Sequence, residues 1–406
     1  MRKATLLAAG LLASAAPAYA QDTKVVDTPD IEIELMGRVM LDQTFASADE
    51  ADENFNTNEA RRLRLGVKGK YGERIKYKFE LNTDSSGDVN AEDAYLQWYP
   101  TGESWSVVVG QDNTHNSFDE LTSSRFSSHI ERAAFTDAFQ LDRRLGVSVL
   151  DQGKNWTAAA GLHTVNLEED GLDEGWAASA RVTGTPVTGE QGLVHVGASW
   201  RYRDQGSDQS LLRYRQRPFS HGLNRIVSTG RAADKDTFYG LEAYGLTGDG
   251  RFWLGGEYAL TKAESTPGGI VEDADFDGAY LEAGAMLGGA RTYKNGKWDR
   301  PKVSRPIGKG GMGALLLSAR YDTLDLTDDA VDGGGLDTWS LTADWYLTKY
   351  AHIAASAFVA DANLGTQTSG LGGEFADLIA AGVQDEDVSG IVIRAQFDFG
   401  TKLGKF

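Results

Sequence analysis

Apolar and polar residues alternate one by one along much of this chain, and residues 61–82 show the pattern clearly. The segment reads RRLRLGVKGKYGERIKYKFELN, in which Leu63 and Leu65 alternate with basic residues and the alternation resumes after Gly72-Glu73. Successive side chains of a β-strand point to opposite faces, so a period of two predicts strands. We therefore predict two strands joined by a tight turn, with one apolar face and one basic face.

The same alternation recurs to the end of the chain. Tight turns such as Gly72-Glu73 alternate with long acidic connections such as ASADEADENFNTNE. Only a closed barrel satisfies every backbone group of a sheet in lipid, and bacterial outer-membrane barrels have short turns at one end and long loops at the other. We therefore predict an all-β fold, a transmembrane antiparallel β-barrel. The seventeen alternating segments lie at 31–45, 59–71, 74–83, 91–99, 104–111, 143–151, 155–162, 175–184, 193–202, 210–217, 236–246, 250–260, 277–288, 312–323, 336–347, 351–361 and 389–399.

The strand number expected from the chain length is about 16, at roughly 24 residues per strand with its share of turn and loop. Single-chain bacterial barrels have an even number of strands, so one of the seventeen segments should lie outside the barrel. The region before residue 45 and the weak segment 155–162 are the two suspects on the sequence alone.

The N-terminus has the features of a secretory signal peptide. Arg2 and Lys3 precede an apolar stretch, and Ala18-Tyr19-Ala20 supplies small residues for cleavage. We expect residues 1–20 to be the signal peptide and residues 21–406 to be the barrel domain. No later stretch has the roughly 18 consecutive apolar residues of a transmembrane helix.

Composition limits the function classes. The chain has no cysteine, 40 basic and 59 acidic residues, and a formal net charge of −19, which argues against nucleic acid as a partner. The histidines form no HExxH spacing and no serine lies in a GxSxG turn, so we expect neither an enzyme nor a cofactor. Loosely bound calcium at the acidic surface loops stays open, and so does a secreted soluble β-protein, either an adhesin or a carbohydrate-active enzyme.

Three arginines recur at a spacing of two in the segment RYRQRP. On one strand, Arg213, Arg215 and Arg217 would lie on one face, about 7 Å apart. Arginine stays charged at physiological pH and fits phosphate and carboxylate oxygens in a bidentate manner. Along a lumen such a row would pass an anion from one site to the next. The alternative is a solvated face paired with acidic neighbours.

The connection from residue 111 to about 134 differs from the others. It contains SFDELTSSRFSSHIERAAF, in which Ser117 and Glu120 have the spacing of a capping box and predict a short helix. A connection of this length with its own structure is usually functional. We expect it to fold inward as a constriction loop, and it carries Arg125 and Arg132.

Several segments together resemble the phosphate- and polyphosphate-selective porins of the O/P type. They are RRLRLGVKGKYGERIKYKFEL, EDAYLQW, DELTSSRFSSHIERAAF, DRRLGV, LLRYRQRPFSHGLNRIVSTG and GMGALLLSARYDTLDLTD. The resemblance covers most of the chain after residue 20. It implies a 16-stranded homotrimeric barrel of the bacterial outer membrane, in contact with lipid and lipopolysaccharide, in which each protomer has its own anion-conducting pore.

The resemblance also implies site residues. Arg61 and Arg62 match the family's arginine pair at the constriction, Arg38 a third arginine, and Asp93 the acidic residue beside them. Strict alternation would put Arg61 and Arg62 on opposite faces, so both can face the lumen only through a bulge. The family's arginine ladder and basic lining match Arg213, Arg215, Arg217, Lys76 and Lys78.

One position departs from the family pattern. Asn113 stands where the family has a constriction-loop lysine, and Asp112 precedes it. We therefore hold two hypotheses for one fold: passive diffusion of small anions, with phosphate or oligophosphate preferred, and a broad or cation-leaning diffusion porin. The sign of ion selectivity distinguishes them.

Overall fold

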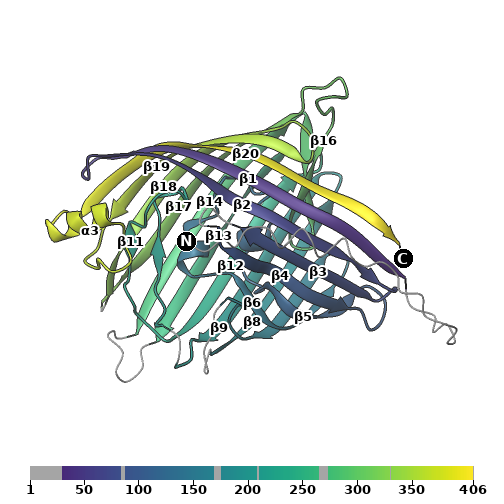
Figure 1. The fold of residues 1–406 in the computed structure, drawn as a ribbon, viewed down its shortest axis with the longest axis horizontal. Coiled ribbons are helices and arrows are strands. Elements are labelled where there is room, and N and C mark those ends of the chain that lie inside the picture. Colours follow the sequence, from purple (N-terminus) through teal and green to yellow (C-terminus); the bar gives the residue numbers. More distant parts are fainter. Residues whose placement is uncertain are drawn as a thin grey trace, which may run out of the picture.

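Sixteen antiparallel strands of the described chain close into one barrel (Figure 1). The structure is a computed structural model that describes residues 30–83, 87–168, 175–207, 210–264, 273–329 and 331–405. The expected signal peptide, residues 1–20, lies outside this range. The barrel strands are β1 (Ile31–Ala48), β2 (Glu53–Tyr71), β3 (Ile75–Thr83), β4 (Val89–Trp98), β5 (Trp105–Asn113), β6 (Arg143–Gln152), β7 (Trp156–His163), β8 (Trp176–Gly189), β9 (Gly192–Asp204), β12 (Lys235–Thr247), β13 (Phe252–Glu264), β14 (Ala274–Leu287), β17 (Ala314–Asp328), β18 (Val331–Tyr346), β19 (Ala351–Asn363) and β20 (Asp385–Lys405).

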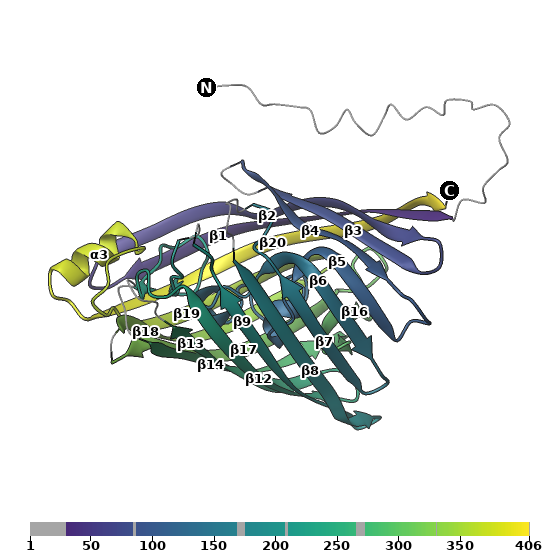
Figure 2. The ribbon, with the colours of Figure 1, turned by 90° about the horizontal axis from the view of Figure 1, so that it is seen from below.

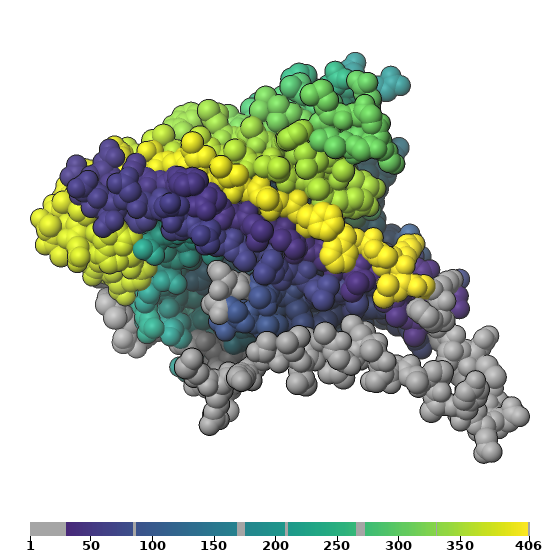
Figure 3. Space-filling model, turned by 45° about the horizontal axis from the view of Figure 1, so that its top comes forward, coloured from purple at the N-terminus to yellow at the C-terminus, as the bar shows by residue number. Residues whose placement is uncertain are grey.

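The first and last strands close the barrel. The space-filling view shows the yellow β20 lying along the purple β1, and Val39 pairs with Phe397 in their register (Figure 3). Inside this seam, Arg394 Nε donates to Asp42 Oδ1 at 2.7 Å, and Arg394 Nη2 lies 2.6 Å from Asp42 Oδ2. Both side chains are buried. A buried ion pair between Asp42 and Arg394 therefore joins the two strands of the seam on the lumen side.

The apolar face of each strand points outward. Leu65 is 56% exposed and Leu341 is 65% exposed. In contrast, charged residues that point into the lumen, such as Arg320 and Asp322 of β17, are buried. A belt of exposed aliphatic side chains around a closed sheet is what lipid requires. The predicted apolar and basic faces of residues 61–82 are thus the outward face and the lumen face.

The prediction of which segment lies outside the barrel was wrong. β1 and β7, the two suspects, are both barrel strands. The extra segment is 210–217. Its β10 (Arg215–Gln216) pairs with β11 (Val227–Ser228) in a separate two-stranded sheet, and Leu212 forms an isolated bridge with Ala233. Its alternation is real, because Tyr214 and Gln216 are buried, but the face they contact is the inside of the barrel.

The long connections lie mostly at one end of the barrel and the tight turns mostly at the other. The exception is the long connection between β14 and β17, which lies with the tight turns, where the sequence predicted short connections. In Figure 2, α3 (Gly373–Ala380), from the connection between β19 and β20, lies at one end, and the region of β16 (Lys297–Val303) lies toward the other. We call these ends the long-loop end and the short-turn end. None of the helices in the described ranges is long and apolar enough to cross a membrane.

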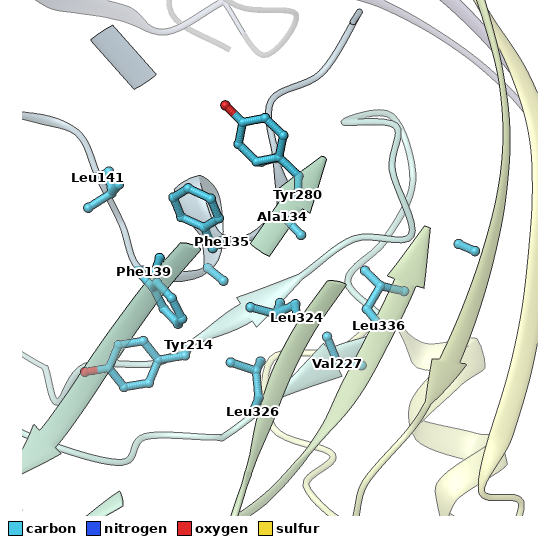
Figure 4. Packing of buried hydrophobic residues seen from close by; sticks show 14 of the residues in the cluster. Ala134, Phe135, Phe139, Leu141, Tyr214, Val227, Tyr280, Leu324, Leu326 and Leu336 are labelled. Atoms are coloured by element: carbon cyan, nitrogen blue, oxygen red, sulfur yellow. The ribbon is translucent and has the colours of Figure 1, made fainter. Parts of the chain in front are cut away.

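Three segments fold into the lumen, where the sequence predicted one. They are the constriction loop, residues 114–142, with α1 (Phe118–Leu121) and α2 (Ala134–Ala138); the β10–β11 segment; and the hairpin of β15 (Gly289–Lys294) and β16. Figure 4 shows Phe135 and Phe139 of the constriction loop among buried residues of the barrel wall and of the β10–β11 segment. Leu324 belongs to the wall, and Tyr214 directly precedes β10. An apolar cluster inside the barrel therefore holds the constriction loop and the β10–β11 segment.

Candidate functional site

The described residues enclose two large chambers in the lumen. The upper chamber, of about 490 Å³, includes Arg217 and Arg225 from the connection at the long-loop end. The lower chamber, of about 320 Å³, includes Lys297 from the β15–β16 hairpin, which enters from the short-turn end. Six residues line both chambers, and we call them the neck: Arg62, Arg64, Glu120, Ser124, Arg132 and Arg143. Four of the six are arginines and one is acidic.

A bulge brings two adjacent arginines into the lumen. Met40 pairs with Arg62 and Leu41 pairs with Ala60, so Arg61 is the extra residue of β2 at this point. Both arginines line the upper chamber, and the bulge expected from the sequence is confirmed. Arg61 is held in a bidentate pair by Glu131 of the constriction loop, with both N–O distances at 3.1 Å.

Carboxylates neutralise most cations of the lower chamber. Arg143 Nε donates to Asp93 at 2.6 Å and Lys78 also contacts Asp93. Lys78 lies 3.1 Å from Glu80, which is itself buried. Arg64 lies 3.3 Å from the same carboxylate. These residues, on β2, β3, β4 and β6, form one network on the lumen wall, because neighbouring strands present successive lumen positions side by side.

Arg38 joins this network from β1. Its Nη1 donates to Ser124 of the constriction loop at 2.7 Å, and its Nη2 is 4.0 Å from Glu80. Arg125, on the same loop, lies 3.7 Å from Asp398. Both arginines line the lower chamber.

Two chamber cations have no carboxylate within ion-pair distance among the described residues. Arg62 in the neck makes one hydrogen bond, from Nη1 to the Met40 sulfur at 3.8 Å, and Lys297 in the lower chamber makes none. A guanidinium has five donors, so Arg62 retains most of its capacity for an anion.

The constriction loop is fixed by the barrel wall. Ser117 caps α1 by accepting from the Glu120 N–H at 3.1 Å, as the capping spacing predicts. Glu257 of β13 accepts from the backbone N–H groups of Phe118 and Asp119, each at 2.7 Å. A wall carboxylate therefore satisfies the free donors at the start of this helix.

Arg132 and Glu120 place opposite charges in the neck on the same loop. Arg132 Nη1 lies 2.9 Å from Glu120 Oε2, and Arg132 Nη2 donates to the Glu120 carbonyl at 2.7 Å. Burial raises the pKa of the Glu120 carboxyl to about 7, although Arg132 favours the charged form. In contrast, Arg61 and Arg394 overcome burial and hold the pKa of the Glu131 carboxyl well below its usual range.

The arginine ladder lies in the connection between β9 and β12. Arg217 lines the upper chamber and is 3.3 Å from Asp137. Arg215 donates to the Gly370 carbonyl at 3.4 Å. Burial lowers the pKa of Arg215, and the neighbouring charges of Arg225 and Arg213 lower it further, so the arginines are close to one another. Arg213 and Arg215 are not among the residues lining the two chambers.

Two further expected positions lie apart from the neck. Lys76 donates to the Tyr99 hydroxyl at 2.9 Å and covers its ring, and it is not among the residues lining either chamber. Asn113 lines the lower chamber beside Asp112, and its backbone N–H donates to the Asp112 carboxylate at 2.9 Å.

Sequence reasoning missed four lining cations: Arg64, Arg143, Arg225 and Lys297. The spacing of two from Arg62 was a signal for Arg64, because it continues the lumen face of β2. Arg143 begins β6 and faces inward beside Asp93, which is distant in the sequence. Nothing local in the sequence distinguishes Lys297 from the exposed Lys294 on the other side of the turn.

Comparison with known proteins agrees with this architecture. The profile of the family phosphate-selective porin O and P matches residues 33–399. A protein of Caulobacter vibrioides, described only as uncharacterised, is 36% identical over 334 residues, which are 78% of this chain and 66% of that protein. The chain thus spans slightly less than two thirds of that relative.

Solved porin structures have the same fold. An anion-selective porin from Comamonas acidovorans superposes with a TM-score of 0.57 at 14% identity, covering 90% of this chain and all of that one. The trimer form of OmpT from Vibrio cholerae gives a TM-score of 0.53 at 13% identity, covering 90% and 99%. The DcaP channel of Acinetobacter baumannii gives 0.53 at 12% identity, covering 91% and 97%.

The closed barrel, its outward apolar belt and its constricted lumen all fit a channel rather than an enzyme. The family profile extends from the first barrel strand to the last. The chain therefore belongs to the phosphate-selective porin O and P family and is a porin of the bacterial outer membrane.

Proposed function

We propose that this porin conducts small anions by passive diffusion, with phosphate or oligophosphate preferred, through a pore lined by arginines. The observation that carries the proposal is the neck, where four arginines face one glutamate and Arg62 has no carboxylate partner among the described residues. The similar fold of a porin described as anion-selective supports it.

The proposed transport involves no chemical step. Arg225 and Arg217 at the upper chamber would recruit an anion, and Arg62 would bind it in the neck. Anions pass such a site only when binding is strong enough to draw them in and weak enough to release them. Ion pairing of the surrounding arginines moderates the positive charge, since a row of unpaired arginines would bind phosphate too tightly to let it go.

A cation-leaning pore is the second candidate, and Asp112 is the observation in its favour. Asp112 lines the lower chamber beside the neutral Asn113, and Asp93 lines it too. The two hypotheses therefore differ in which charge dominates an ion's path, the arginines of the neck or the carboxylates below it.

The assembly and the surroundings are also proposals. We infer a homotrimer, in keeping with the trimer form of OmpT, whose fold is similar. The apolar belt would contact outer-membrane lipid, and the loops at the long-loop end would contact lipopolysaccharide. The native mass of the detergent-solubilised protein tests the trimer, and a monomeric mass would contradict it.

The deciding measurement is the reversal potential of the purified protein in a planar bilayer under a KCl gradient, repeated with inorganic phosphate. We expect anion selectivity and block of the chloride current by phosphate. Replacing Arg213, Arg215 and Arg217 together by Ala should weaken both, because Arg217 lines the upper chamber and the other two arginines add positive charge near it. Cation selectivity, or a current indifferent to phosphate, would overturn the proposed function in favour of the second candidate.

A further inference from the structure

Lys297 occupies an unusual place for a charged residue on a turn at the short-turn end. The sequence Lys294-Asn295-Gly296-Lys297 forms the tip of the β15–β16 hairpin, with φ of 51° at Asn295 and 76° at Gly296. Positive φ at both central residues is the type I′ turn that Asn-Gly favours. The hairpin reaches into the lumen, so its tip lies against the constriction loop and not in the solvent below the barrel.

The backbone on both sides of Lys297 is fixed. Arg181 of β8 donates to the Gly296 carbonyl at 2.6 Å, and Arg181 is itself paired with Glu242. On the other side, the Trp298 backbone N–H donates to Thr122 Oγ1 of the constriction loop at 3.3 Å. Two anchors, one to the wall and one to the loop, leave the position of Lys297 little freedom.

The side chain of Trp298 adds a third anchor. Its ring packs edge-on against Phe118 of α1 and Tyr244 of β12, with centroid distances of 5.2 and 5.4 Å, and the guanidinium of Arg291 lies over it at 4.5 Å. Trp298 is buried. The hairpin is therefore part of the packed interior, although it enters from the short-turn end.

The ammonium of Lys297 has no partner of its own among the described residues. It lines the lower chamber and makes no ion pair or hydrogen bond, whereas Lys78 in the same chamber has two carboxylates within ion-pair distance. Holding an unpaired, partly desolvated cation rigidly costs free energy, because charge is stabilised by water or a counter-charge. An anion that enters from outside the protein would lower this free-energy cost by binding to the Lys297 ammonium.

We propose that Lys297 is the anion-binding residue of the lower chamber and a determinant of anion selectivity, which receives phosphate after Arg62 in the neck. The inference rests on the proposed function, since it adds a second anion-binding site to the same permeation path. The two cations without a carboxylate partner in the described part of the chain lie in successive compartments, Arg62 shared by both chambers and Lys297 in the lower one only. An ion leaving the neck therefore meets a free cation among the carboxylates Asp93 and Asp112.

The absence of cysteine from the chain permits a sharp test. Lys297→Cys gives a protein with a single thiol, which can be modified in the open channel by a cationic or by an anionic thiol reagent. The matched control is Lys294→Cys, which removes the same charge from the same turn at an exposed position that lines neither chamber. The readout is the concentration of inorganic phosphate that halves the chloride current in a planar bilayer.

We expect Lys297→Cys to raise this half-blocking phosphate concentration about tenfold, because one charge-assisted contact to the anion is lost. The cationic reagent should restore block toward the wild-type value, and the anionic reagent should weaken it further. Lys294→Cys should respond to neither. Lys297→Gln gives a second uncharged variant of similar length if the thiol variant assembles poorly, and Lys297→Arg should keep the block.

The outcomes separate the two proposals. Wild-type block with unchanged block in Lys297→Cys and Lys297→Gln would overturn the role of Lys297 and leave the proposed function standing. Equal effects at Lys294 and Lys297 would do the same, because they would show a general field and no site. A wild-type channel that phosphate does not block would overturn the proposed function itself.

Discussion

At the residue scale, the difference between a paired and an unpaired arginine is open to test at adjacent positions. Arg61 is committed to Glu131, whereas Arg62 has no carboxylate partner among the described residues. We expect Arg62→Ala to weaken phosphate block about tenfold or more through loss of charge-assisted contacts to the anion. Arg61→Ala should change block less and stability more, because it leaves Glu131 with only Arg394. Bilayer block and thermal unfolding measure the two effects, and the reverse ranking would contradict the assignment.

The pH dependence of selectivity also belongs to a residue, Glu120. Burial raises its pKa to about 7; Arg132 and Arg143 favour its charged form, and Asp119 and Asp142 oppose it. As the pH falls through this value the carboxyl gains a proton and the neck loses its negative charge. The reversal potential in KCl should therefore shift toward stronger anion selectivity between about pH 8 and about pH 6. In Glu120→Gln the shift should vanish, and an unchanged shift would assign it to another group.

At the scale of elements, the hairpin and the constriction loop should act as one plug. Trp298 lies between them, so Trp298→Ala should cost roughly 3–5 kcal/mol of packing free energy. The barrel wall can survive this loss, so we expect larger and noisier single-channel conductance together with a lower thermal midpoint. Trp339→Ala, on the lipid face at 64% exposure, is the control and should leave the conductance unchanged. Quiet, wild-type conductance in Trp298→Ala would show that the loop needs no support from the hairpin.

At the scale of the whole molecule, the buried Asp42–Arg394 ion pair of the β1–β20 seam should contribute to barrel stability. Asp42→Asn breaks a buried pair and leaves Arg394 only partly compensated by Glu131. Removing one partner of a buried ion pair costs roughly 3–5 kcal/mol. Circular dichroism of the detergent-solubilised protein should show a lower thermal midpoint. The exposed pair Lys262–Asp275 is the comparison, and Lys262→Ala should cost at most about 1 kcal/mol. Equal losses of stability in the two variants would contradict a special role for the Asp42–Arg394 pair.

Sequence alone determined the barrel, the direction of each face and the capped helix that begins at Phe118, whereas the bulge at Arg61 was expected only from the family resemblance. These features are local, because alternation, turn residues and capping depend on neighbours within a few positions. The same logic failed at 210–217, where a real alternation belongs to a segment inside the barrel. A period of two indicates that the two faces of a segment differ, but it does not indicate whether the segment belongs to the barrel wall or packs inside the barrel.

Only the tertiary structure decided which cations are free to bind an anion. Arg61 and Arg62 are adjacent, yet one is paired with Glu131, 70 residues away, and the other is not. Lys294 and Lys297 are equivalent on the turn, yet only Lys297 lines a chamber. Ion pairs join side chains that the closure of the barrel brings together, and the energy of a charge depends on its surroundings in space. The sequence therefore shows where the arginines are, but not which of them lacks a carboxylate partner among the described residues.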